Sequence, residues 1–298
     1  MTGRLIAFAA AALATLMTGV LPGVPLAPAG AAGDPVLVGA GDIASCTASG
    51  DTKTAALVSA IPGTVFTTGD NVYPSGTLSQ FQSCYDPTWG AFKSRTRPSA
   101  GNHDYETAGA SGYFAYFGSS AGDAGKGYYA YNLGAWRIYA LNSNCADVGG
   151  CGATSAQTKW LKADLAANPR RCVLAYWHHP LFSSGAHGNH ARSRAFWDVL
   201  YAAHADVILN GHDHDYERFG RQTPSGTASA NGIREFVVGT GGAERRPFGS
   251  IKRQSLVRNA TTFGVLKLTL HATSYDWKFV PEAGKTFTDS RTGAPCRA

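Results

Sequence analysis

Charged residues are scarce in this 298-residue chain: they make up 15% of it, against 44% hydrophobic residues. That balance excludes a disordered or low-complexity protein, in which charges outnumber the apolar residues needed for a core. The chain has 26 lysines and arginines and 20 aspartates and glutamates, so its formal charge is +6, spread along the sequence. Because nucleic-acid-binding arms need clustered basic charge, we expect no nucleic-acid-binding module.

Three further signals are missing. No two cysteines have the Cys-x-x-Cys spacing of a zinc site. The run Gly239-Thr240-Gly241-Gly242 lacks the lysine and the serine or threonine of a phosphate-binding P-loop, so we interpret it as a tight return after a strand over residues 233–238. No proline- or serine-rich linker interrupts the chain after its N-terminal segment, which predicts one domain over residues 33–298.

The N-terminal segment has the composition of an export signal. Arg4 precedes an apolar run from Leu5 to Val20, prolines follow, and small residues lead to a cleavage site near Ala31 or Ala32. This order predicts a signal peptide over residues 1–32 and a secreted mature chain. The uninterrupted run is shorter than the about 20 apolar residues of a membrane span, so we expect no stable membrane anchor after cleavage. The oligomeric state is left open.

All six cysteines lie in the predicted mature chain, an even number in a compartment where disulfides persist. Sequence alone permits fifteen pairings. We predict that Cys46 pairs with Cys84, Cys145 with Cys151 across a glycine-rich loop, and Cys172 with Cys296.

The main structural pattern is a series of short apolar runs that end in polar residues. Strands are predicted over residues 35–40, 64–68, 97–100, 172–177 and 206–210. Each is followed by a Gly-Asp, Gly-Asn-His or histidine-rich segment. Continuous apolar runs are typical of strands buried on both faces in α/β proteins. Such folds place their sites just beyond the strand ends.

Helices are predicted between these strands. Phe196, Val199, Leu200 and Ala203 form one apolar stripe on a helix over residues 192–204, and a second helix is predicted over 155–167. Residues 128–133 and 136–142 read as a hairpin, and further strands are predicted over 263–270 and 274–280. The fold class is therefore mixed α/β.

Each polar strand end is weak evidence taken singly, because Gly-Asp after a strand is a common turn. Five successive strand ends, however, offer carboxylates, an amide and imidazoles, and a tyrosine follows one of them. Oxygen and nitrogen donors in this mixture suit first-row transition metals. The sequence therefore indicates a metal site.

These segments resemble, in order, the five motif blocks of the purple acid phosphatases, which are calcineurin-like metallophosphoesterases. The blocks are Asp42, Gly69-Asp70-Asn71-Val72-Tyr73, Gly101-Asn102-His103-Asp104, Ala175-Tyr176-Trp177-His178 and Gly211-His212-Asp213-His214. The resemblance implies a single-domain, four-layer αββα sandwich with two metal ions. Two departures, Ala44 and Ala175 where the family commonly has glycine and valine, remove no ligand.

The resemblance also implies the ligands. One metal is expected on Asp42, Tyr73 and His214, the other on Asn102, His178 and His212, and Asp70 would bridge both. A tyrosinate suits Fe(III), and neutral imidazoles with an amide suit a divalent Fe, Zn or Mn ion. Tyr73 separates the chain from the protein Ser/Thr phosphatases of the superfamily, which read Gly-Asp-x-x-Asp-Arg-Gly at this block.

Two histidines are expected to be catalytic. His103 would face the phosphate, and His187, nine residues beyond His178, matches a second active-site histidine of the family. Asp104 either orients His103 or caps a helix. The basic residues around Arg246 are interpreted as a solvated loop, with steering of an anionic substrate as the alternative.

The function implied is that of a secreted acid phosphatase. It would hydrolyse phosphate monoesters, small molecules or phosphoproteins, by in-line attack of hydroxide held by the metals. One alternative is a secreted phosphodiesterase or nucleotidase on the same metal core. Another is a catalytically silent metal-binding or adhesion protein, against which the presence of His103 beside a full ligand set argues.

Overall fold

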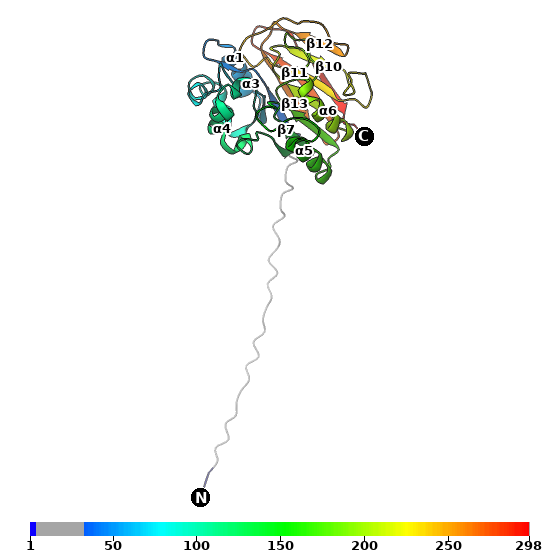
Figure 1. Cartoon of the computed structure of the whole chain (residues 1–298). Helices are drawn as coiled ribbons and strands as arrows, with labels where there is room; N and C mark the ends of the chain where they lie inside the picture. Colours follow the sequence, from blue (N-terminus) through cyan, green and yellow to red (C-terminus); the bar gives the residue numbers. More distant parts are fainter. Residues whose placement is uncertain (4–32, 298) are drawn as a thin grey trace. The chain divides into compact units, whose positions relative to one another are not determined.

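Two β-sheets packed face to face form the centre of the protein (Figure 1). The computed structural model describes residues 1–3 and 33–297, so most of the predicted signal peptide lies outside the described residues. Residues from Asp34 onward form one compact unit. Among the described residues, no helix has both the length and the apolar character needed to cross a bilayer.

The first sheet has six strands and contains the first three strands predicted from the sequence. β1 (Val36–Ala40), β3 (Thr64–Thr68) and β5 (Thr96–Ser99) run parallel in that order. On the other side of β1, the sheet continues antiparallel with β13 (Gly264–Leu270), β14 (Ser274–Pro281) and β15 (Ser290–Pro295). The carboxyl ends of β1, β3 and β5 therefore meet at one edge.

The second sheet has seven strands in the order β12-β10-β11-β9-β8-β7-β6. Its parallel centre consists of β7 (Trp136–Ala140), β8 (Cys172–Tyr176), β9 (Val207–Asn210) and β11 (Arg234–Val238). Its antiparallel strands are β6 (Tyr129–Leu133), β10 (Tyr216–Phe219) and β12 (Ser255–Asn259). A separate parallel pair joins β2 (Ala44–Ser45) to β4 (Val72–Tyr73).

Aromatic side chains join the facing surfaces of the sheets. The rings of Phe66 in β3 and Tyr176 in β8 have centroids 5.9 Å apart, and the Tyr176 hydroxyl donates to the carbonyl oxygen of Arg97 at 2.8 Å. Phe236 in β11 lies 5.7 Å from Trp277 in β14. Burial of these large rings stabilises the packing of the two sheets.

Helices cover the outer faces. α5 (Ala156–Ala167) and α6 (Arg194–Ala202) pack through Leu161 and Phe196 against Ile208 of the seven-stranded sheet, and α1 (Gly50–Ser59) contacts β13 of the other. The predicted αββα order is confirmed. The remaining helical segments are α2 (Leu78–Gln80), α3 (Asn102–Tyr105), α4 (Ser111–Phe117), a π-helix (Phe81–Tyr85) and 3-10 turns at Trp89–Arg95, Ala108–Ala110, Gly118–Ala121 and Ala191–Ser193.

The predicted helix ends shift by two residues at α6. A 3-10 turn at Ala191–Ser193 precedes the helix, which starts at Arg194 and not at residue 192. At its other end His204 adopts a positive φ of 59°, a conformation that cannot continue a right-handed helix. The second predicted helix begins as expected, because the Ser155 side chain accepts a hydrogen bond from the Thr158 amide.

Three disulfides form, and they are the three predicted pairs. Cys46 bonds to Cys84, Cys145 to Cys151 and Cys172 to Cys296, with Cα–Cα distances of 5.1, 5.1 and 5.5 Å. Cys172 begins β8 of the seven-stranded sheet, whereas Cys296 follows β15 of the six-stranded sheet. This third disulfide therefore links the two sheets covalently.

Candidate metal centre

The seven residues predicted as ligands lie where the two sheets meet. Asp42, Asp70 and Asn102 follow β1, β3 and β5 of the six-stranded sheet, and Tyr73 ends the short strand β4. His178 follows β8, and His212 and His214 follow β9, in the seven-stranded sheet. Polar residues at the ends of buried parallel strands form sites in other α/β folds for the same reason, since the strand ends converge at one edge.

The backbone turns sharply at three of these positions. Asp42, Asp70 and His212 have positive φ angles of 58°, 49° and 70°. Residues other than glycine rarely adopt this region, and such strained positions cluster at functional sites. A glycine precedes each of the three residues and permits close approach: a Cβ at Gly211 would collide with the Asp42 carboxylate. The loops are thus packed so tightly that side chains from both sheets converge.

Asp42, Tyr73 and His214 form the first group. The Tyr73 hydroxyl lies 3.0 Å from Asp42 Oδ1 and 3.1 Å from His214 Nε2. His214 Nε2 is also 3.3 Å from Asp42 Oδ1. The orientation of the Asp42 carboxylate is fixed by a second contact, since its Oδ2 accepts a hydrogen bond from the His212 amide at 2.9 Å.

Asn102, His178 and His212 form the second group. His178 Nε2 lies 3.0 Å from Asn102 Oδ1 and 3.1 Å from His212 Nδ1. Asp70 Oδ2 lies between the two groups, 3.1 Å from the Tyr73 hydroxyl and 3.3 Å from His178 Nε2. The structure therefore brings together all seven predicted residues, and Asp70 Oδ2 lies within 3.3 Å of an atom of each group.

More lone pairs meet here than protons can satisfy. The Tyr73 hydroxyl has one proton, yet two carboxylate oxygens, of Asp42 and Asp70, and the Nε2 atom of His214 all lie within 3.1 Å of it. The ring of His178 donates from Nδ1 to the carbonyl oxygen of Thr68 at 2.8 Å, so Nε2 is the ring atom that faces Asn102, Asp70 and His212. Buried acceptors without donors are costly, and bound cations would satisfy both groups. The donor set therefore fits two metal ions.

The pKa shifts at the centre also favour bound cations. Burial, with the charges of Asp42 and Asp70, raises the pKa of Tyr73 well above its usual value, so a phenolate here requires a cation beside it. Burial lowers the pKa of His178, but Asp70 and Asp42 outweigh burial and raise it to about 9. Burial alone would raise the pKa of Asp70, yet the imidazoles of His178 and His103 lower it well below its usual range. The buried carboxylates thus favour positive charge between them.

His103, predicted as catalytic, stands at the edge of this centre. Its ring lies 4.4 Å from the Tyr73 ring, and its Nε2 is 4.0 Å from Asp70 Oδ2. Its Nδ1 donates to the carbonyl oxygen of Pro74 at 2.6 Å, because that oxygen only accepts. Nε2 therefore carries a proton only when the ring is positively charged. Asp104 caps helix α3 by accepting from the Gly101 amide at 2.8 Å, which is the second of its two predicted roles.

His187, the other predicted catalytic residue, also reaches the centre. Its ring stacks on that of His212 with centroids 4.4 Å apart, and its amide donates to Asp213 Oδ1 at 2.7 Å. The Arg246 guanidinium donates to its Nε2 at 2.5 Å. Partial burial and that guanidinium lower its pKa, although the Asp213 carboxylate opposes them.

The sequence analysis missed Glu244 at the rim, and it interpreted Arg246 as part of a solvated loop, with steering of an anionic substrate as the alternative. Glu244 Oε1 lies 3.9 Å from His214 Nδ1, and Arg246 is bonded to both Glu244 and His187. Neither residue lies in a recognisable motif. Both belong to the loop after β11, and the position of this loop follows from the place of β11 between β9 and β10 in the sheet. No signal in the sequence marks that long-range neighbourhood.

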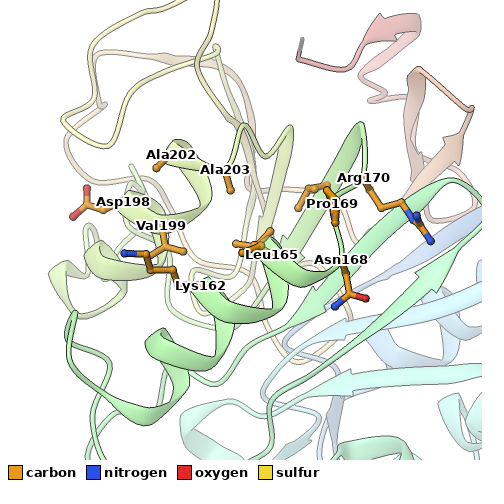
Figure 2. A pocket seen from close by; sticks show the side chains of 11 residues that line it. Lys162, Leu165, Asn168, Pro169, Arg170, Asp198, Val199, Ala202 and Ala203 are labelled. Atoms are coloured by element: carbon orange, nitrogen blue, oxygen red, sulfur yellow. The ribbon is translucent and has the colours of Figure 1, made fainter.

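Two cavities differ in their relation to the centre. A polar cavity of about 280 Å³ borders Asn102 and is lined by Tyr105, Glu106, Asn144 and Arg192, among others. A cavity of about 520 Å³ lies between α5 and α6 and is lined partly by Leu165 and Val199 (Figure 2). None of the predicted site residues lines this second cavity. Of these two cavities, the first therefore lies beside a residue of the centre, Asn102.

Comparison with known proteins places the chain in a class. A sequence profile described as "Calcineurin-like phosphoesterase" matches residues 38–216, which contain every residue of both groups. The chain belongs to the calcineurin-like phosphoesterase family.

Within that family it is similar to purple acid phosphatases. It is 30% identical over 184 residues to purple acid phosphatase 15 of Arabidopsis thaliana, a match covering 51% of this chain and 34% of the relative. It is 35% identical over 94 residues to purple acid phosphatase 22 of the same plant, covering 30% and 21%. The matches thus span about a third or less of the length of these relatives.

Solved structures share the fold. Purple acid phosphatase PPD1 from yellow lupin (Lupinus luteus) superposes with a TM-score of 0.66 at 17% identity, covering 86% of this chain and 53% of that one. GAP50, described as the anchor in the inner membrane complex of Plasmodium, has a TM-score of 0.66 at 14% identity and covers 90% of both chains. At these identities the likeness shows the fold alone.

Proposed function

We propose that this chain is a secreted, binuclear-metal acid phosphatase that hydrolyses phosphate monoesters. The observation that carries the proposal is the Tyr73 hydroxyl within 3.1 Å of two carboxylate oxygens and an imidazole nitrogen, beside a second group of polar atoms around His178. Membership of the phosphoesterase family supports the same reading. The three disulfides support export, because such bonds persist in oxidising compartments.

Asp42, Tyr73 and His214 would hold one metal and Asn102, His178 and His212 the other, with Asp70 shared. Fe(III) suits the phenolate of Tyr73, and a divalent Fe, Zn or Mn ion suits the amide and imidazoles. When bound, the two cations would supply a water of lowered pKa and would polarise the phosphoryl oxygens.

The protein groups around the centre would orient the ester. The cavity beside Asn102 gives space for the leaving group. Because the Pro74 carbonyl holds the Nδ1 proton of His103, the Nε2 atom faces the centre. In its charged form His103 would donate from Nε2 to the phosphate or to the departing alkoxide.

His103→Ala tests this role. We expect kcat to fall about 100- to 1,000-fold, the usual contribution of a general acid, with the metal content unchanged. Steady-state kinetics and elemental analysis measure the two quantities. His271→Ala is the control, since His271 pairs with Asp34 and Asp276 away from the centre. Loss of metal in His103→Ala, or wild-type kcat, would contradict the role.

Tyr73→Phe tests the iron assignment. The wild-type protein should show a visible absorption band from tyrosinate bound to Fe(III), and the variant should lose it because only the phenolate oxygen is removed. Tyr128→Phe, which changes a tyrosine that packs against Trp160, should keep the band. A colourless, iron-free and active wild-type enzyme would leave the fold in place and refute the iron assignment.

Rates on a monoester, a diester and a nucleotide separate the proposal from a phosphodiesterase or nucleotidase on the same core. Metal-loaded protein without turnover on any of the three would refute the enzymatic proposal and favour a metal-binding protein. The three compounds share the phosphoryl group, so any difference in kcat/KM reports on the ester and the leaving group.

A further inference from the structure

The loop between β11 and β12, residues 239–254, is hydrogen-bonded to the candidate metal centre. The amide of Ala243 donates to the carbonyl oxygen of Asp42 at 3.0 Å, and the amide of Arg246 donates to the carbonyl oxygen of His214 at 3.2 Å. Both carbonyls belong to residues of the first group. The backbone of the loop therefore has a fixed place beside the centre, unlike that of a freely solvated basic loop.

The Arg246 side chain turns toward the centre. Two of its nitrogens, Nε at 2.7 Å and Nη2, donate to Glu244 Oε1. The third, Nη1, donates to His187 Nε2 at 2.5 Å. The His187 ring in turn stacks on His212. Glu244 fixes the orientation of the guanidinium, and His187 fixes its distance from the second group of acceptors.

The Arg246 guanidinium has N–H donors that remain available for a ligand. Arginine has five N–H donors, and three are taken up by Glu244 and His187, which leaves two without a partner among the described residues. The side chain is 34% exposed, so a ligand can reach it. The neighbouring Arg245 is directed elsewhere, donating to the carbonyl oxygen of Thr261 at 3.0 Å and to Glu282.

We propose that Arg246 binds the phosphoryl group of the substrate and selects phosphate monoesters over diesters. This inference rests on the proposed function and names the residue that would decide the class of ester. A monoester has three non-bridging oxygens and a charge of about −1.5 to −2 near neutral pH. A diester has two such oxygens and a single charge. A guanidinium beside the centre therefore gains more from the monoester.

The test compares Arg246→Gln with Arg246→Lys and with the neighbouring control Arg245→Gln. Substrates are 4-nitrophenyl phosphate and bis(4-nitrophenyl) phosphate. We expect Arg246→Gln to lower kcat/KM for the monoester about 10- to 100-fold, the loss of a hydrogen bond to a charged group, and that for the diester by less than about 3-fold. Arg246→Lys should lie between, and Arg245→Gln should match the wild type.

A binding measurement accompanies the kinetics. Calorimetric titration with inorganic phosphate should show about 10-fold or weaker affinity in Arg246→Gln, at unchanged metal content. Equal losses on both esters, unchanged kinetics, or metal loss in parallel with activity would overturn the role of Arg246. If the wild type hydrolyses neither ester, the proposed function fails, and the phosphate titration alone then decides whether Arg246 binds phosphate.

Discussion

Asp70→Asn is expected to lower kcat about 1,000-fold or more and to leave the protein short of at least one metal ion, because a single well-placed electrostatic contact alone contributes about 100- to 1,000-fold. Asparagine keeps the size of the side chain and can keep the contact of Oδ1, which accepts from the His103 amide at 2.8 Å. It replaces only Oδ2, the atom between Tyr73 and His178, with an NH₂ group.

Elemental analysis and steady-state kinetics, made on the same sample, check this expectation. Asp198→Asn is the matched control, since Asp198 pairs with Arg194 on the exposed side of α6. Circular dichroism should show that both variants fold. An Asp70→Asn protein that retains two metals and the wild-type kcat would show that Asp70 is no bridging ligand.

The second large effect is on stability. Removing the disulfide between Cys172 and Cys296 with a double alanine substitution should lower the free energy of unfolding by about 5 kcal/mol, because the bond closes a loop with a sequence separation of 124 residues. Chain-entropy arguments assign more stabilisation to longer loops, since the unfolded chain loses more freedom. Here the bond also links one sheet to the other.

The double alanine variant at Cys145 and Cys151 is the control. It removes two sulfurs as well, but its loop has a separation of only six residues, for which the same argument gives about 2 kcal/mol. Guanidinium unfolding of oxidised samples measures both values. Equal destabilisation in the two variants would show that loop length is not the dominant contribution.

The strand ends were predictable because their signals are local. An apolar run followed by Gly-Asp, as before Asp42 and Asp70, reveals both a buried strand and a polar turn within a few residues. The fold carries these ends to one edge, so the polar residues that follow the strands, Asn102 and His178 among them, sufficed to predict a metal site there. The resemblance to a known family added which residues belong to which group.

Other features depend on contacts between distant segments. Helix α1 was not predicted, because its buried face mixes Ala55 and Val58 with the polar Asp51 and Thr54 and so shows no clear apolar stripe. The buried hydroxyl of Thr54 has hydrogen-bond partners far along the chain, among them the carbonyl oxygen of Gly241. Arg246 was interpreted as solvated for a similar reason: its partner His187 is 59 residues away.

The candidate metal centre is complete only when the two sheets are packed together, because its residues come from both. Asp42, Asp70 and Asn102 arrive with one sheet and His178, His212 and His214 with the other, so neither half of the chain carries a complete set for the two ions. Binding of both ions would therefore require the two sheets to be packed together. Bound ions would stabilise the packing of the two sheets, and separation of the sheets would release the metal.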